Sequence, residues 1–170
     1  EKDEAVGAME KMAAHEQAIL HRAFSVFVFN TAGDVLMQQR AHSKYHSGGL
    51  WTNTCCSHPR PGEEVVAAAT RRLHEEMGFT TSLTKAFDFT YKAVFENGLT
   101  EHEFDHVIIG QYDGVVNFNP NEVAAYAFMP VHELELQIQE TPERFTAWFH
   151  IAYPALKAWM AEPQNQIHAV

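Results

Sequence analysis

One stretch constrains this chain more than any other: residues 51–79, which read WTNTCCSHPRPGEEVVAAATRRLHEEMGF. It places a thiol and an imidazole two residues apart, at Cys56 and His58, ahead of a turn rich in proline and glycine. A helix is predicted after the turn, because apolar residues recur there at three- and four-residue spacing: Val66, Ala69, Leu73 and Met77. Gly78 follows the last of them and is expected to end the helix.

Charged residues occupy the other faces of this predicted helix. They are Glu63, Arg71, Arg72, Glu75 and Glu76. Carboxylates suit hard divalent cations, which commonly bridge protein oxygens to the phosphates of a substrate. The stretch therefore predicts a thiol-bearing loop that leads into a helix with paired carboxylates.

The rest of the chain alternates between predicted strands and helices. Strands are expected at residues 23–30, 35–40, 87–94, 101–112 and 124–129, and Asn97-Gly98 lies in the loop between the third and the fourth. Helical patterns are expected at parts of 1–22, at 131–140, and from a Thr141 cap and Pro142 onward to Trp159. Mixed strands with helices on either side predict a layered α/β (α+β) fold.

Composition and charge narrow the function. The 170 residues are 46% hydrophobic with a formal net charge of −10, which argues against nucleic acid or anionic membranes as partners. No apolar run reaches the roughly 18 residues of a membrane span. An anionic substrate would need local basic residues and a metal ion. The two cysteines, Cys55 and Cys56, are adjacent and make a poor disulfide, so reduced thiols in a cytoplasmic protein are expected.

Residues 57–79 resemble the Nudix box, G-x5-E-x7-R-E-U-x-E-E-x-G-U, where U is a bulky apolar residue. The matching positions are Glu63, Arg71, Leu73, Glu75, Glu76, Gly78 and Phe79. Ser57 replaces the first glycine, and Arg72 replaces a glutamate that helps to bind metal in Nudix diphosphate hydrolases. These departures and the preceding W-T-N-x-x-C-x-H-P resemble type I isopentenyl-diphosphate delta-isomerases. The resemblance implies a Nudix fold and one isomerase domain over residues 1–170.

The resemblance also implies a metal site of three histidines and two glutamates: His15, His21, His58, Glu101 and Glu103. The two glutamates lie two apart on a predicted strand, a spacing that puts both carboxylates on one face. This set suits Mn²⁺, Zn²⁺ or Mg²⁺. The six-residue gap between the first two histidines is slightly shorter than in the family. Outside the motif, any of the 11 histidines is expected to be an ordinary surface or hydrogen-bonded imidazole.

A second ion, Mg²⁺ on the substrate diphosphate, is implied at Glu76 and the backbone carbonyl of Cys56. The alternative for Glu76 is a solvated ion pair with Arg72, worth about 0.3–0.5 kcal/mol. Arg40, Lys44 and Arg72 match the family's diphosphate contacts, since guanidinium and ammonium groups complement phosphate oxygens. The alternative for the first two is a solvated basic loop.

The catalytic residues implied are Cys56, Glu103, Tyr91 and Trp148. Moving a carbon–carbon double bond requires a proton at one end and loss of a proton at the other, through a tertiary carbocation kept from water. Glu103, beside a metal and the Tyr91 hydroxyl, is expected to deliver the proton, and Cys56 to remove the other as thiolate. The Trp148 ring is expected to stabilise the cation. The alternatives are core packing for Trp148 and a structural role for Tyr91.

The implied reaction interconverts isopentenyl and dimethylallyl diphosphates. The protein is expected to be a monomer or weak homodimer, and its expected ligand is a prenyl diphosphate. Three other functions remain open. A Nudix pyrophosphohydrolase is disfavoured by Arg72 in place of glutamate. A thiol enzyme built on Cys56 and His58 would leave Glu101 and Glu103 without a role. A metal-binding module would not need thiol, acid and aromatic groups together.

Overall fold

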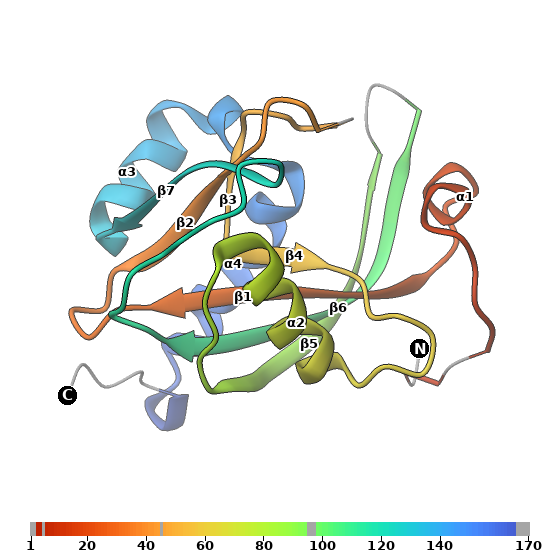
Figure 1. Cartoon of the computed structure of the whole chain (residues 1–170), viewed down its shortest axis with the longest axis horizontal. Coiled ribbons are helices and arrows are strands. Elements are labelled where there is room, and N and C mark those ends of the chain that lie inside the picture. Colours follow the sequence, from red (N-terminus) through yellow and green to blue (C-terminus); the bar gives the residue numbers. More distant parts are fainter. Residues whose placement is uncertain (1–2, 5, 45, 95–97, 166–170) are drawn as a thin grey trace.

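The computed structural model describes residues 3, 4, 6–44, 46–94 and 98–165 (Figure 1). Its strands are β1 His21–Phe29, β2 Val35–Arg40, β3 Trp51–Thr52, β4 Cys55–Ser57, β5 Leu83–Val94, β6 Thr100–Gln111 and β7 Val123–Met129. Its helices are α1 Lys11–Glu16, α2 Val65–Met77, α3 Val131–Glu140 and α4 Ala147–Met160, with 3-10 turns at Pro142–Arg144 and Pro163–Asn165. None of the described helices is long and apolar enough to cross a bilayer.

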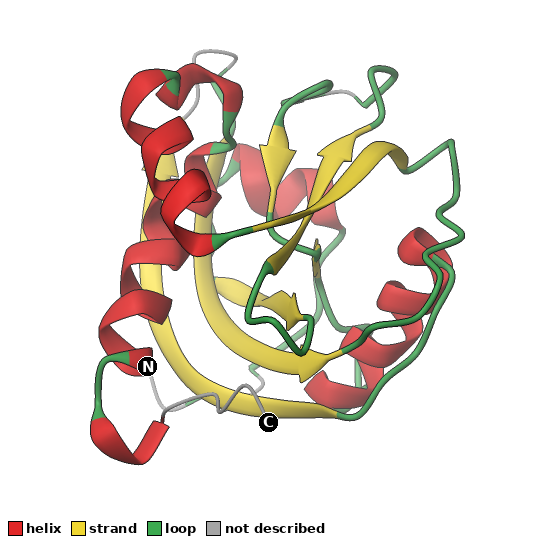
Figure 2. Cartoon of the chain, turned by 90° about the vertical axis from the view of Figure 1, so that its left-hand side faces the viewer, coloured by secondary structure: helices red, strands yellow, loops and turns green. Residues whose placement is uncertain are grey.

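The strands form one mixed sheet in the order β3–β2–β1–β6–β5, with β4 beside β1 and β7 beside β2. β1 runs parallel to β6 over its whole length and antiparallel to β4. The sheet is strongly curved, and helices lie on both sides of it (Figure 2). This arrangement confirms the predicted α/β (α+β) class, a mixed sheet packed between helices.

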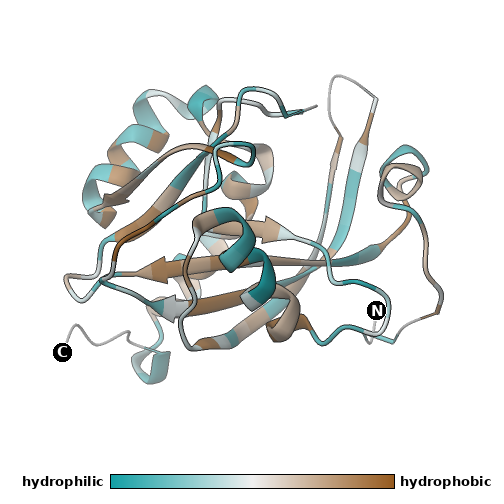
Figure 3. Ribbon diagram, in the orientation of Figure 1, coloured by the Kyte–Doolittle hydropathy of each residue, from teal (hydrophilic) through white to brown (hydrophobic). Residues whose placement is uncertain are grey.

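Strand β1 is the centre of the core because it is buried on both faces, as its almost continuous apolar sequence favours. Phe24, Val26 and Val28 join the cluster that includes the apolar face of α2. Phe27 and Phe29 point to the opposite face and join the cluster that includes α4. Hydrophobic residues accordingly concentrate along β1 and β2 (Figure 3).

Helix α2 begins and ends much as its sequence predicts. Glu64 caps its start, where its side chain accepts a hydrogen bond from the backbone N–H of Ala67. Gly78 ends it in the left-handed region, with φ 74°. A Cβ at this position would lie 1.9 Å from the backbone oxygen of Asn117. The helix therefore stops at a residue that only glycine fits.

Two local predictions are wrong. The last helix does not start at Pro142: Phe145 is extended, with φ −111° and ψ 151°, and α4 begins two residues later. The interruption arises because Phe145 pairs with Trp51, whose carbonyl accepts a hydrogen bond from the Thr146 N–H over 3.0 Å. The residues around Cys56 are not a loop but strand β4, which pairs with β1.

The remaining boundaries move by a few residues. β5 starts at Leu83, four residues before the prediction, because its first residues are exposed or only partly buried and carry no apolar pattern. Asn97 of the predicted turn lies outside the described residues, and Gly98 beside it has a φ of 81°.

Candidate active site

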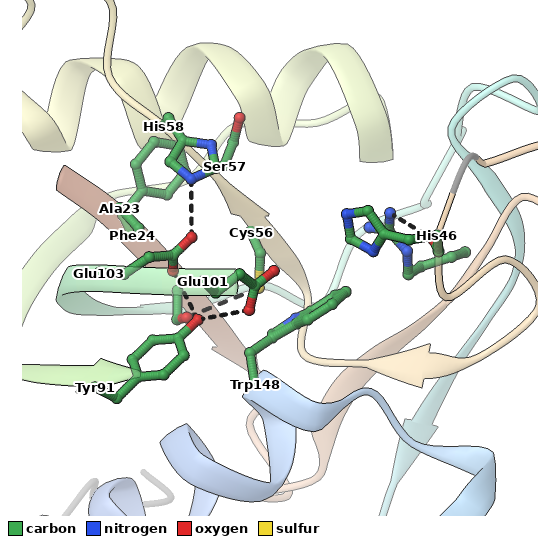
Figure 4. A pocket seen from close by; sticks show the side chains of 12 residues that line it. Ala23, Phe24, His46, Cys56, Ser57, His58, Tyr91, Glu101, Glu103 and Trp148 are labelled. Atoms are coloured by element: carbon green, nitrogen blue, oxygen red, sulfur yellow. Dashed lines mark hydrogen bonds and ion pairs between the residues drawn. The ribbon is translucent and has the colours of Figure 1, made fainter. Parts of the chain in front are cut away.

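A pocket of about 390 Å³, partly open to solvent, gathers the predicted catalytic residues (Figure 4). Its lining comprises Ala23, Phe24, Ser25, Arg40, His46, Cys56, Ser57, His58, Tyr91, Glu101, Glu103 and Trp148. Strands β1, β4, β5 and β6 supply most of these residues, and helix α4 supplies Trp148.

Three imidazoles from separate segments converge on one carboxylate oxygen. Nε2 of His15, His21 and His58 lies 4.0, 3.5 and 2.9 Å from Oε1 of Glu103. His15 comes from α1, His21 begins β1 directly opposite Glu103 on β6, and His58 follows β4. One ligand atom from each of the four residues lies within 4.8 Å of the others, as one metal ion requires.

The chemistry of these donors fits a divalent cation. His21 Nδ1 lies 2.7 Å from the Ile19 carbonyl oxygen, which can only accept, so this nitrogen carries a proton. Nε2, which faces Glu103, is therefore the nitrogen that would bind a metal ion. His15 is 2% exposed, and its Nε2 has no hydrogen-bond partner in the described part of the chain. Histidine nitrogens with a carboxylate are typical ligands of transition-type ions.

Glu101, the fifth predicted ligand, lies beside this cluster rather than within it. The Tyr91 hydroxyl is 2.7 Å from Glu103 Oε2 and 3.0 Å from Glu101 Oε2, so the tyrosine sits between the two carboxylates. Burial and these two negative charges raise the pKa of Tyr91 and keep it a donor. Burial alone would raise the pKa of Glu103, but the three imidazoles outweigh it and hold that pKa well below its usual range.

The adjacent cysteines face opposite sides of β4. Cys55 is fully buried in the core beside α2, whereas Cys56 is only partly buried and lines the pocket. The Cys56 thiol donates to Asn53 Oδ1 over 2.9 Å. Burial, and then the charge of Asp105, raises the pKa of Cys56.

The surroundings of the two proposed proton carriers shift their pKa values in opposite directions: the pKa of the Cys56 thiol is raised and that of the Glu103 carboxyl is lowered. The proton roles expected for the two residues stay predictions. The physical reason is local: burial disfavours a thiolate, while three imidazoles stabilise the carboxylate.

Sequence reasoning missed two polar residues beside the thiol, Ser25 and Asp105. Ser25 Oγ donates to Asp105 Oδ2 over 2.8 Å and lies 3.8 Å from the Cys56 sulfur. Burial and the Glu103 charge raise the pKa of Asp105 to about 8. A signal for Asp105 was available, since it continues the alternate-residue row of Glu101 and Glu103 along β6. Nothing in the sequence singles out Ser25.

The Trp148 ring lines the pocket and lies near the positively charged side chain of Arg40. The Arg40 guanidinium carbon is 5.1 Å from the ring centroid, within the range of cation–π contacts. The His46 ring, which the sequence reasoning left out, packs edge-on to Trp148 at 5.6 Å. Arg40 is the one predicted diphosphate contact that lines the pocket.

Lys44, Arg72 and Glu76 do not line the pocket; Lys44 and Arg72 both contact Glu122, and Arg72 also contacts Glu76. Arg72 Nη2 lies 2.5 Å from Glu76 Oε1 and 3.5 Å from Glu122 Oε2, and Lys44 pairs with the same Glu122 oxygen. Glu76 also accepts a hydrogen bond from Gln38 Nε2 over 3.0 Å. The alternative of an Arg72–Glu76 ion pair is thus present, but Glu76 is only 5% exposed, so the pair is not solvated.

The fold resembles solved Nudix-type proteins. A MutT protein from Methanosarcina mazei superposes with a TM-score of 0.67 at 16% identity, over 84% of this chain and 96% of its own. A MutT Nudix hydrolase from Burkholderia pseudomallei gives 0.62 at 18% identity, over 79% and 96%. Residues 19–149 also match the model of the NUDIX domain family. The predicted Nudix fold is therefore confirmed.

Similarity in sequence narrows the family. The isopentenyl-diphosphate Delta-isomerase of Pectobacterium atrosepticum is 48% identical over 167 residues, covering 98% of this chain and 93% of that protein. Isopentenyl-diphosphate Delta-isomerase 2 of Aromatoleum aromaticum is 51% identical over 148 residues, covering 87% and 78%. Identity at this level over nearly whole chains confirms the resemblance found in the Trp51–Pro59 motif: the chain belongs to the isopentenyl-diphosphate Delta-isomerase family of NUDIX-domain proteins.

Proposed function

We propose that the protein interconverts isopentenyl and dimethylallyl diphosphates by adding a proton to one end of the alkene and removing a proton from the other. The observation that carries this proposal is the shared pocket of Cys56, Glu103, Tyr91 and Trp148. A thiol, a carboxylate with its tyrosine, and an aromatic face are what a double-bond shift requires. Hydrolysis of a diphosphate needs neither the thiol nor the aromatic face.

The two proton transfers balance as follows. One group gives a proton to the terminal CH₂ carbon of the alkene, which leaves a tertiary cation at the neighbouring carbon. The other group takes a proton from the adjacent CH₂, and the electrons of that C–H bond form the new double bond. Cys56 and Glu103 are the proposed pair, and since the reaction is reversible they exchange roles with its direction.

Trp148 and Tyr91 support the charged intermediate and the acid. The indole face of Trp148 already accommodates the Arg40 guanidinium, so it suits a substrate cation as well. Tyr91 donates to Glu103 and steadies the charge that this carboxylate holds between the two transfers. Phe24 and Ala23 contribute apolar side chains to the pocket wall, as suits a site that must keep water from the cation.

Divalent ions are part of this proposal. His15, His21, His58 and Glu103 would hold one, with Glu101 as the fifth ligand, and Mn²⁺, Zn²⁺ and Mg²⁺ all suit the set. Such an ion supplies positive charge next to the carboxylate. Glu76 and the Cys56 carbonyl are proposed to meet a Mg²⁺ that arrives with the diphosphate.

Arg40, Lys44 and Arg72 are proposed to bind the diphosphate. Arg40 is at the pocket, whereas Lys44 and Arg72 are engaged with Glu122 and would have to turn from it. We infer that the protein resides in the cytoplasm, because both cysteines are free thiols. Residues 1–170 are proposed to act as one domain. Light scattering tests the expected monomer or weak homodimer.

The decisive experiment is incubation with isopentenyl diphosphate and Mg²⁺ in D₂O, followed by proton and phosphorus NMR. Dimethylallyl diphosphate that carries solvent deuterium, with its diphosphate intact, is the expected product. Release of phosphate or pyrophosphate would instead make the protein a Nudix hydrolase. Turnover that survives a chelator would favour a thiol enzyme built on Cys56 and His58.

A further inference from the structure

A chain of buried hydrogen bonds joins Trp148 to Cys56 through two residues that do not line the pocket. Trp148 Nε1 donates to Thr52 Oγ1 over 2.9 Å, and Thr52 Oγ1 donates to Asn53 Oδ1 over 2.9 Å. The Cys56 thiol donates to the same Asn53 oxygen over 2.9 Å. The proposed cation-stabilising ring and the proposed proton carrier are thus linked through polar groups alone.

Asn53 can take only one orientation in this network. Its Nδ2 donates to the backbone oxygens of Val26 and Cys55, each over 3.0 Å. Turning the amide over would set its oxygen against both carbonyl oxygens and lose both bonds. Oδ1 is therefore fixed toward Thr52 and Cys56. The side chain is 0% exposed, so no water competes for these positions.

The Thr52 hydroxyl is equally determined. It accepts from Trp148 Nε1 and from Thr146 Oγ1, the latter over 3.0 Å. Both of its lone pairs are then occupied, which leaves its single proton for Asn53 Oδ1. Thr52 is 1% exposed and Thr146 is 0% exposed. A fully satisfied buried network of this kind holds its members rigidly.

We propose that Thr52 is a positioning residue for the isomerisation: its hydroxyl orients the Trp148 ring and, through Asn53, the Cys56 thiol, so that ring and sulfur keep one relative position. This inference rests on the function proposed above. Thr52 acts only through other residues, because it does not line the pocket. Its removal should therefore lower kcat and leave the KM for the prenyl diphosphate nearly unchanged.

The test uses three substitutions. Thr52→Val keeps the shape and removes the hydroxyl, and Thr52→Ser keeps the hydroxyl. Thr54→Val is the matched control: Thr54 is also fully buried and bonds to the backbone of Val28 and Leu36, but it has no bond to Trp148 or Cys56. We expect kcat to fall about tenfold to a hundredfold in Thr52→Val, with KM within about twofold, and to stay near wild type in the other two variants.

A second readout does not depend on activity. In ¹⁵N–¹H spectra, the indole N–H of Trp148, assigned through Trp148→Phe, should be protected from solvent exchange in the wild type and in Thr54→Val. It should shift upfield and exchange faster in Thr52→Val, and recover in Thr52→Ser. Should Thr52→Val not fold, the wild-type indole decides: fast exchange there overturns the network.

The two proposals fail in different ways. If the wild type does not turn over isopentenyl diphosphate, the proposed function fails, whatever the indole signal does. If the wild type is active and Thr52→Val keeps its kcat, or if Thr54→Val loses as much, Thr52 is not a positioning residue.

Discussion

Tyr91 and Glu103 lie directly opposite each other on β5 and β6, and the tyrosine hydroxyl donates to Glu103 Oε2 over 2.7 Å. The three imidazoles face the other oxygen, Oε1. The two oxygens of one carboxylate therefore have different neighbours, one in the candidate metal site and one in the pocket. This division allows the two functions of Glu103 to be separated by mutation.

Tyr91→Phe should lower kcat by about a hundredfold, because it removes a donor to a charged group of the proposed reaction. Metal affinity should change little, since the Oε1 side keeps all three imidazoles. Steady-state kinetics and a metal titration measure the two effects. Tyr112→Phe is the control, because that hydroxyl donates to the Val115 carbonyl at the surface. Equal losses of activity and metal in Tyr91→Phe would contradict the separation.

The neighbouring cysteines give a matched pair. Cys56→Ala should nearly abolish turnover without unfolding the protein, since its side chain lines a pocket. Cys55→Ala should keep turnover but lower the free energy of unfolding by about 1–2 kcal/mol, because it leaves a gap in the core. Kinetics and urea unfolding on both variants test this. Substantial turnover by Cys56→Ala would remove the thiol from the mechanism.

Removal of divalent metal should abolish turnover and lower the melting temperature, since the ion would bind only the folded chain. His58→Asn should weaken Mn²⁺ or Zn²⁺ binding by more than about a hundredfold, as expected for loss of a direct ligand. Calorimetric titration measures this. His74→Asn, at an exposed position of α2, is the control and should bind metal as the wild type does. Undiminished binding by His58→Asn would place the metal elsewhere.

Stability should also depend on pH through Glu63. Two hydrogen bonds from Arg71, of 2.8 and 2.9 Å, are the main cause that lowers the Glu63 pKa to about 2. An unfolded glutamate titrates near about 4.3. The contribution of ionised Glu63 to the free energy of unfolding is therefore complete above that pH and is lost as the pH falls toward 2.

Urea unfolding of the wild type and Glu63→Gln between pH 6 and pH 2 tests this. The difference in unfolding free energy should be largest at pH 6 and vanish at the acid end. In an Arg71→Gln background the difference should be smaller throughout, with only the bond from the Arg60 N–H remaining. A difference that does not depend on pH would rule out this linkage.

Many of the secondary-structure elements could be predicted from the sequence. Strand β1 and helix α2 carry strong periodic signals, and Gly78 marks a helix end that no larger residue fits. β4 is too short for any pattern, and the break before α4 depends on a contact between Phe145 and Trp51, which are far apart in the chain. Such tertiary contacts leave no local trace.

In the candidate active site, too, features with a local sequence signal could be predicted, and those that depend on tertiary contacts could not. The family resemblance identified seven of the twelve residues that line the pocket: Arg40, Cys56, His58, Tyr91, Glu101, Glu103 and Trp148. The directions in which the pKa values of Cys56 and Glu103 shift could not be predicted, because burial and the three converging imidazoles exist only after folding. Glu122 lies in a loop without any motif, and its ion pairs with Lys44 and Arg72 form only when the fold brings these residues together.

The convergence of His15, His21, His58 and Glu103 has a consequence for the entropy of the chain. A cation bound there would be a removable cross-link, which closes a loop from α1 near the start to β6 beyond the middle. A long closed loop costs little more entropy than a short one, so one ion would tie down a large part of the polypeptide. Folding of the first segment and uptake of the ion would then be one equilibrium.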